Sequence, residues 1–398
     1  MSDIIYNWLM IKRDLEPLVK AASKKFPIVG IVGPRQSGKT TLAKTAFPKY
    51  AYVSLEDLDN RIFAQQDPRG FIATYSQHTI FDEIQKVPDL FSYLQTKVDE
   101  SNIPGQYILT GSQHFLLHKH ISQTLAGRIA LFNLLPLAVS ELETARIRFD
   151  TYEEYLFHGM YPRLFESSIK PIDWYPNYIQ TYIERDIRDL KQISDLSTFQ
   201  IFVKLCAGRV GQLLNLSSLA RDCGITHNTA KAWLSLLETS FVVFLLPPYY
   251  ENFGKRLVKM PKLYFYDTGL VCSLLGLQKY QDLYTHYLKG NLFENFIIGE
   301  FLKQKYDHQK PVEYYFWRDK TGHEIDLLGI ETNGIRAIEI KAGKTIASDY
   351  FSNLTYFSTI SKSKKNIIKQ VIYAGSRTQR HTDTIILGKN AFLHSQPL

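Results

Sequence analysis

Short apolar runs that end in polar residues recur along the first third of the chain. They lie at residues 26–32, 50–55, 78–81, 106–109 and 129–134. Continuous apolar runs of this kind are typical of strands buried on both faces, as in a parallel sheet. An apolar-periodic helix precedes them at residues 5–25. The pattern predicts an α/β core built on a parallel sheet.

The apolar positions take up a helical period beyond this core. Residues 151–205 are mainly helical by this measure and predict a helical lid. Residues 216–237 predict two helices joined by a turn, in which a glycine ends the first helix and a threonine caps the second. Strands at residues 241–246 and 262–266 follow. Helix-turn-helix spacing followed by two strands predicts a winged helix.

The last third of the chain predicts a second α/β unit. A helix at residues 290–300 is followed by strands at 314–318, 323–328 and 337–341. The Asn-Gly pair at residues 333–334 favours a tight hairpin between the last two of these strands.

Composition narrows the class of protein. A chain of 398 residues with 45% hydrophobic and 22% charged residues predicts a soluble globular protein of about two or three domains. No basic segment and apolar run open the chain as in a signal peptide, and the apolar runs are too short to span a bilayer. The three cysteines lack metal-ligand spacing, so we expect a cytoplasmic protein without membrane contact. The net charge of +8 favours a polyanionic partner.

The stretch at residues 33–40 fits the phosphate-loop pattern G-x-x-x-x-G-K-[ST] between a predicted strand and a predicted helix. In that context, several backbone N–H groups point at one phosphate. Lys39 is expected to reach the β- and γ-phosphates of ATP, and the Thr40 hydroxyl to ligate Mg²⁺. The residues expected to contact ATP are Gly33, Pro34, Arg35, Gln36, Ser37, Gly38, Lys39, Thr40, Thr41 and Ser112.

Two further strand ends are candidates for the same site. Asp82 and Glu83 follow an apolar strand about 40 residues after the phosphate loop, as in a Walker B motif. Asp82 is expected to hold the Mg²⁺ shell and Glu83 to deprotonate the attacking water. The next strand resembles the sensor-1 strand of an AAA+ ATPase, which implies a hydroxyl near the γ-phosphate. Ser112 is the first choice for it, with Thr110 and Gln113 behind it. A plain turn at this point is the alternative.

Three arginines are candidates for contacts with the nucleotide. Arg128, just before the last core strand, resembles the arginine finger of AAA+ rings, and this resemblance implies that it reaches a neighbouring subunit's γ-phosphate. The alternative is a surface arginine near a helix C-terminus. Arg163 and Arg185 in the predicted lid are candidates for a second nucleotide sensor, although solvated or ion-paired arginines have the same pattern.

The predicted winged helix offers a surface for DNA. The candidate contacts at the start of the second helix and in the basic wing are His227, Asn228, Thr229, Lys231, Lys255 and Arg256. The same fold is also a common protein-interaction module, so both partners remain open.

The last domain contains an ordered set of acids and one lysine. Glu339 and Lys341 are two residues apart on a strand, so their side chains share a face, and a hairpin brings Asp326 beside them. Two carboxylates can hold Mg²⁺ while Lys341 positions water against a phosphodiester. With Glu294 upstream, the set resembles a PD-(D/E)XK nuclease core. The alternative is a fold that only binds DNA, with the acids in ion pairs.

On these motifs the whole chain resembles a prokaryotic AAA+ family that joins an archaeal-ATPase-like core to a winged helix and a nuclease-like domain of unknown function. The resemblance implies an ATPase core at residues 1–145, a lid at 146–210, a winged helix at 211–285 and a PD-(D/E)XK-like domain at 286–398. It also implies ATP and Mg²⁺ as cofactors, self-association into a ring, with a hexamer expected, and a motor or remodelling activity on DNA. A signalling-type nucleotide switch with protein partners is the second hypothesis.

Overall fold

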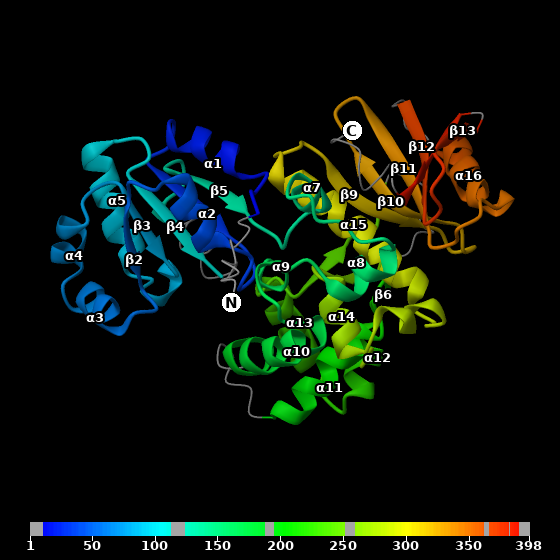
Figure 1. Ribbon diagram of the computed structural model, residues 1–398, viewed down its shortest axis with the longest axis horizontal. Helices are drawn as coiled ribbons and strands as arrows, with labels where there is room; N and C mark the ends of the chain where they lie inside the picture. Colours follow the sequence, from blue (N-terminus) through cyan, green and yellow to red (C-terminus); the bar gives the residue numbers. More distant parts are fainter. Residues whose placement is uncertain are drawn as a thin grey trace, which may run out of the picture.

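The computed structural model describes residues 11–112, 124–187, 195–250, 259–361, 366–381 and 383–389. The first sheet has five parallel strands in the order β2-β3-β4-β1-β5 (Figure 1). The strands are β1 Ile28–Val32, β2 Ala51–Ser54, β3 Thr79–Asp82, β4 Tyr107–Gly111 and β5 Ile129–Asn133. The parallel sheet predicted from the apolar runs is confirmed.

Helices cover both faces of this sheet. On one face α1 and α2 pack on strand residues such as Val29, and on the other α4 and α5 pack on residues such as Phe81. The helices are α1 Glu16–Ser23, α2 Lys39–Ala46, α3 Leu58–Gln66, α4 Pro68–Thr74 and α5 Leu90–Ser101. The helix predicted at residues 5–25 is wrong in its length: within the described residues it begins at Glu16, where Pro17 in the first turn favours a helix start.

The region that follows the core is mainly helical, as its apolar spacing predicts. A helical segment at Ile179–Ile187 continues directly from α10. The rings of Tyr161, Trp174 and Tyr178 pack with centroids 4.8–5.0 Å apart and hold α10 against the segment before α9. The helices are α7 Val139–Thr144, α8 Tyr152–His158, α9 Arg163–Glu166, α10 Pro171–Tyr178 and α11 Leu196–Ala207.

Two helices joined by a short turn come next. Gly224 takes a φ of +68° in the turn, and the Thr226 side chain accepts a hydrogen bond from the Thr229 N–H at the start of the second helix. A small antiparallel sheet in the order β6-β8-β7 packs beside them. The elements are α12 Leu216–Asp222, α13 His227–Thr239, α14 Thr268–Leu274, β6 Gln212–Leu213, β7 Val243–Leu246 and β8 Lys262–Phe265.

The last unit has a six-stranded sheet in the order β13-β14-β12-β11-β10-β9. Strands β9, β10 and β11 are antiparallel neighbours, and β12 and β14 run parallel to β11. The hairpin predicted at residues 333–334 is confirmed by the pairing of β10 with β11. The elements are α15 Lys289–Asp307, α16 Ser352–Ile360, β9 Glu313–Arg318, β10 Glu324–Ile330, β11 Gly334–Lys341, β12 Asn366–Tyr373, β13 Gln379–His381 and β14 Thr384–Gly388.

Helix α15 lies centrally and connects this last sheet to the unit that contains the parallel sheet (Figure 1). The Val139 N–H donates to Glu300 Oε2 at 2.9 Å, and Lys303 Nζ donates to the Leu137 carbonyl at 2.8 Å. Glu300 and Lys303 are buried and pair with each other at 2.6 Å. These hydrogen bonds therefore belong to a buried interface between the first unit and the last.

Candidate functional site

The phosphate loop runs from β1 into α2 at the carboxyl edge of the parallel sheet. A Cβ at Gly33 would lie 2.0 Å from the Leu134 carbonyl oxygen, so only glycine fits there. Gly38 takes a φ of +92°, a left-handed conformation that also favours glycine. The buried Lys39 side chain donates from Nζ to the carbonyls of Gly33 at 3.0 Å and Pro34 at 2.7 Å. The loop therefore has the local geometry that its sequence predicts.

The predicted Mg²⁺ ligands lie together. The Thr40 hydroxyl is 2.9 and 3.1 Å from the two carboxylate oxygens of Asp82, although the residues are 42 positions apart. Asp82 also accepts hydrogen bonds from the hydroxyls of Thr110 and, at 2.8 Å, Tyr52. A hydroxyl and a carboxylate at this spacing are the donor set that Mg²⁺ uses beside a phosphate loop, so the residues fit the metal.

Glu83 is held at the same edge by two side chains. Its backbone has a φ of +55°, which turns the chain immediately after β3. The Ser112 hydroxyl donates to Glu83 Oε2 at 2.8 Å, and the Gln85 amide donates to the same oxygen. The Ser112 hydroxyl is therefore hydrogen-bonded to Glu83, the residue predicted to be the general base. The predicted contact of Ser112 with the γ-phosphate stays a prediction.

A cleft of about 290 Å³ lies over these residues. It is lined by the phosphate loop, Asp82 and Glu83, and on the other side by Pro162, Arg163 and Glu166. Arg163, one candidate for a second sensor, is exposed and lines the cleft, whereas the side chain of Arg185 is outside the described residues. The predicted ATP contact Arg35 forms an exposed ion pair with Glu56 at 3.1 Å at the same cleft.

Lys39 is the buried cation of this cleft. Burial lowers its pKa, and the carboxylates of Glu83 and Asp82 partly oppose that effect. A phosphate group beside Lys39 would favour its charged form further.

Arg13 is a residue of this site that sequence patterns missed. Its buried guanidinium donates to Glu141 Oε1 at 2.8 Å, to the carbonyl of Ser37 in the phosphate loop at 2.6 Å and to the Leu135 carbonyl at 2.7 Å. No local motif marks it, because its partners lie 24 to 128 residues away.

Arg128 does not contact the phosphate loop of its own chain. It lies just before β5, and its carbonyl accepts a hydrogen bond from the N–H of Ile28, the first residue of β1. The phosphate loop follows the last residue of β1, so Arg128 lies at the opposite end of this strand. Its guanidinium forms a two-point ion pair with Asp99, at 2.5 and 2.8 Å. Any role at a nucleotide is therefore one played on another subunit.

The four predicted nuclease residues gather at one place. Lys341 Nζ lies 2.5 Å from Glu339 Oε2 and 3.6 Å from Asp326 Oδ2, and the Ile340 N–H donates to the same Asp326 oxygen at 2.7 Å. Burial raises the pKa of Glu339 to about 8, with Asp326 adding to the effect. Burial also raises the pKa of Glu294 to about 7. Removal from water is the main cause of both shifts, and the nearby lysines Lys341 and Lys262 oppose it by lowering the two pKa values.

Lys262 of β8 is a second lysine beside these acids, and the predictions from the sequence did not include it. Its buried ammonium lies 2.9 Å from Glu294 Oε1 and also pairs with Glu324. Burial lowers the pKa of Lys262, but the surrounding carboxylates outweigh burial and raise it. Within the described parts of the chain, no group of three or more His, Cys, Asp or Glu side chains is arranged to hold a metal ion. The acids pair with two lysines, and whether they hold a metal or serve only in ion pairs stays a prediction.

The helix-turn-helix surface agrees with its prediction in part. His227, Asn228 and Lys231 are exposed at the start of α13. Thr229 is half-buried, and its hydroxyl is hydrogen-bonded to that of Thr226 at 2.8 Å in the helix cap, so its contact with DNA stays a prediction. The predicted wing residues Lys255 and Arg256 lie outside the described residues.

Three family models match the chain in succession. An AAA domain matches residues 25–143, a domain of unknown function (DUF8612) residues 149–281, and a second domain of unknown function (DUF4143) residues 289–391. The AAA match spans the parallel sheet with its phosphate loop, Asp82 and Glu83.

Relatives that match most of the chain show the family to which it belongs. The chain is 31% identical to the uncharacterized protein Rv2008c of Mycobacterium tuberculosis over 330 residues, 82% of this chain and 72% of the relative. The chain belongs to this family of AAA-domain proteins. Another similar protein is the uncharacterized protein MJ1544 of Methanocaldococcus jannaschii, at 24% identity over 354 residues, 80% of this chain and 75% of that protein.

Solved structures add only a distant likeness to this AAA-domain protein. The Walker-type ATPase PABY2304 of Pyrococcus abyssi has 13% identity and a TM-score of 0.42, over 67% of this chain and 96% of that one. In the described part of this family member, no helix is long and apolar enough to cross a membrane.

Proposed function

We propose that this AAA-domain protein is a Mg²⁺-dependent ATP hydrolase. The observation that supports this most directly is the contact of the Thr40 hydroxyl with both Asp82 oxygens, at 2.9 and 3.1 Å, beside Glu83. Thr40 and Asp82 would hold Mg²⁺, which neutralises charge that develops on the phosphates. Lys39 would exchange its two loop carbonyls for phosphate oxygens. Glu83, oriented by Ser112, would accept the proton of the attacking water.

We further propose that hydrolysis acts on DNA as a motor or remodelling step. The net charge of +8, the exposed start of α13 and the small sheet beside it support a winged helix that binds a polyanion. The test is the ATPase rate with and without linear, forked and four-way-junction DNA. Stimulation by at least one of these forms is expected, and a rate that is the same without DNA as with each of them would contradict the proposal.

A nucleotide-dependent switch with protein partners is the second candidate, and one observation favours it. The acids of the last unit are paired with Lys262 and Lys341, an arrangement suited to a stable binding domain. In a switch, any DNA binding would be absent or insensitive to salt, because phosphate contacts release counterions.

Lys231 provides a test of the DNA surface. Lys231→Ala is expected to weaken DNA binding several-fold and to lower the slope of log affinity against log salt by about 1, since one phosphate contact is lost. Fluorescence anisotropy at several salt concentrations measures both. Lys24→Ala, at an exposed lysine of the ATPase core, is the matched control and should leave the slope unchanged. An unchanged slope in Lys231→Ala would exclude this surface.

Arg128 provides a test of assembly into a ring. If Arg128 acts on a neighbouring subunit, Arg128→Ala should bind ATP normally but lose on the order of 10³-fold in hydrolysis. Mixing it with Glu83→Gln should restore part of the rate, because some interfaces then combine an intact Glu83 with an intact Arg128.

Asp99→Ala is the control for this experiment. It breaks the same ion pair but keeps the guanidinium. An equal loss in Asp99→Ala, or no rescue on mixing, would make Arg128 a structural residue.

A further inference from the structure

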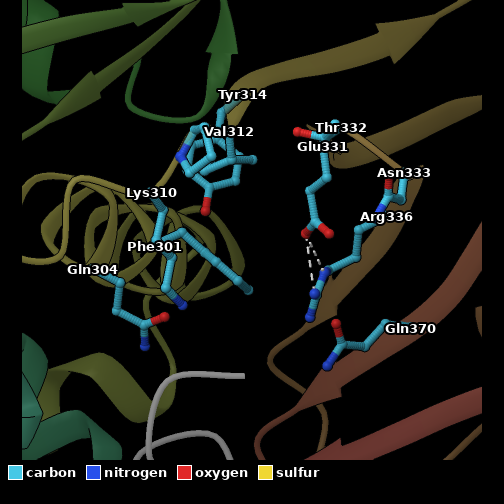
Figure 2. Close-up of a pocket in the computed structure, with 11 residues that line it drawn as sticks. Phe301, Gln304, Lys310, Val312, Tyr314, Glu331, Thr332, Asn333, Arg336 and Gln370 are labelled. Carbon is cyan, nitrogen blue, oxygen red and sulfur yellow. Dashed lines mark hydrogen bonds and ion pairs between the residues drawn. The ribbon is translucent and has the colours of Figure 1, made fainter.

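The last unit contains a cavity of about 380 Å³, separate from the phosphate loop and from the acid cluster (Figure 2). It lies between the C-terminal part of α15 and the end of the β10–β11 hairpin. Phe301, Val312 and Tyr314 form an apolar wall, in which the centroids of the two aromatic rings lie 5.8 Å apart and the ring planes are inclined by 61°. The volume falls within the range of about 300–1,000 Å³ that small-molecule sites occupy.

Gln370 on β12 is the polar group that points to a ligand. Its side chain extends into the cavity from the side opposite the apolar wall (Figure 2). The residue is only 2% exposed, yet its amide oxygen has no hydrogen-bond partner. Buried polar side chains are nearly always paired, so an unpaired amide on a cavity wall is explained by a partner that enters the cavity.

The charges on the wall favour an anion. Arg336 pairs with Glu331 through Nε at 3.1 Å and through a terminal nitrogen at 3.0 Å, and Lys310 lies across the cavity from them, beside Phe301 (Figure 2). The described residues that line the cavity thus include two cations and one carboxylate. Burial lowers the pKa of Lys310, and Arg336 lowers it further, so a bound anion would favour the charged lysine.

We propose that this cavity binds a nucleotide with a single phosphate, through contacts with base and phosphate. The Gln370 amide offers one donor and one acceptor, the pair that glutamine presents to the edge of adenine. Phe301 and Tyr314 offer aromatic surface for the base, and Lys310 and Arg336 offer charge for the phosphate. The nucleotide comes either from solution or from the 5′ end of a DNA strand.

The experiment is calorimetric titration of AMP into the full chain carrying Lys39→Ala, which removes phosphate-loop binding from the measurement. Saturable binding is expected, with adenosine and ribose 5-phosphate each binding more weakly because each lacks one half of the contacts. Gln370→Leu and Lys310→Met should each weaken AMP binding about tenfold. Lys320→Met, at an exposed lysine outside the cavity, is the matched control and should leave the affinity unchanged. Circular dichroism checks that each variant is folded.

Two outcomes would overturn the proposal. One is the absence of saturable AMP binding to a folded Lys39→Ala chain. The other is binding that Gln370→Leu and Lys310→Met both leave unchanged, which would place the AMP elsewhere. A 5′-phosphorylated trinucleotide then separates the two sources: displacement of AMP by it, and not by its unphosphorylated form, supports a strand end, and binding of AMP without such displacement supports a free nucleotide.

Discussion

Glu83→Gln is expected to bind Mg²⁺-ATP and to lose about 10²- to 10⁴-fold in turnover, because the amide keeps the shape of the side chain but cannot accept a proton. Lys39→Ala is expected to lose both turnover and tight ATP binding at the phosphate loop, since it removes the only buried lysine among the residues that line that cleft. Phosphate release measures turnover, and equilibrium binding of labelled ATP measures affinity.

Glu56→Gln is the matched control for this pair. Glu56 lines the same cleft but is exposed and pairs with Arg35, so its loss should change turnover little. If Glu83→Gln hydrolyses ATP at the normal rate, Glu83 is not the general base. If Glu56→Gln loses as much turnover as Glu83→Gln, the loss reflects the removal of any negative charge from the cleft and not the removal of a general base.

The second large effect is expected in the last unit. If Asp326, Glu339 and Lys341 cleave DNA with Mg²⁺ or Mn²⁺, then Asp326→Ala and Lys341→Ala should each abolish cleavage and keep DNA affinity. The measurement compares wild type with both variants on several DNA forms, with each metal and with EDTA. Glu313→Ala is the control, because Glu313 is an exposed acid on the same sheet, paired only with Lys305 among the partners that the structure describes.

Each result of that comparison has a definite meaning. Cleavage that is lost in both variants and kept in Glu313→Ala establishes the nuclease, with Glu294 as a further ligand or orienting carboxylate. Equal cleavage in all four proteins indicates a contaminant. No cleavage in any of them leaves a domain that binds DNA or protein, held together by the ion pairs of Lys262 and Lys341.

The sequence predicted the parts of the site that depend on local order. The phosphate loop is contiguous, and the approach of Thr40 to Asp82 follows from parallel strands whose carboxyl ends share one edge. The hairpin that brings Asp326 to Lys341 follows from its turn residues. In each case a rule of geometry connects positions in the chain to positions in space.

The contacts that it missed follow no such rule. Arg13, Tyr52 and Lys262 reach their partners through packing between elements that are far apart in the chain, and their own neighbours in sequence are unremarkable. Thr229 was placed on the outer surface because its position suits a recognition helix, but a threonine three residues after a cap can also bond to that cap. Spacing alone does not decide between the two.

The ion pairs of Lys262 connect two segments of the chain that different family models match. It sits on β8, in the segment matched by one family model, whereas Glu294 and Glu324 belong to the segment matched by the next. Removing one partner from a buried ion pair costs about 3–5 kcal/mol, so neither segment can change alone without loss of stability. In relatives, a neutral residue at the position of Lys262 should accompany the replacement of Glu294, Glu324 or both. The two segments are therefore expected to have evolved as one unit, and a gene fusion that exchanged only the last would leave Glu294 without the lysine that pairs with it.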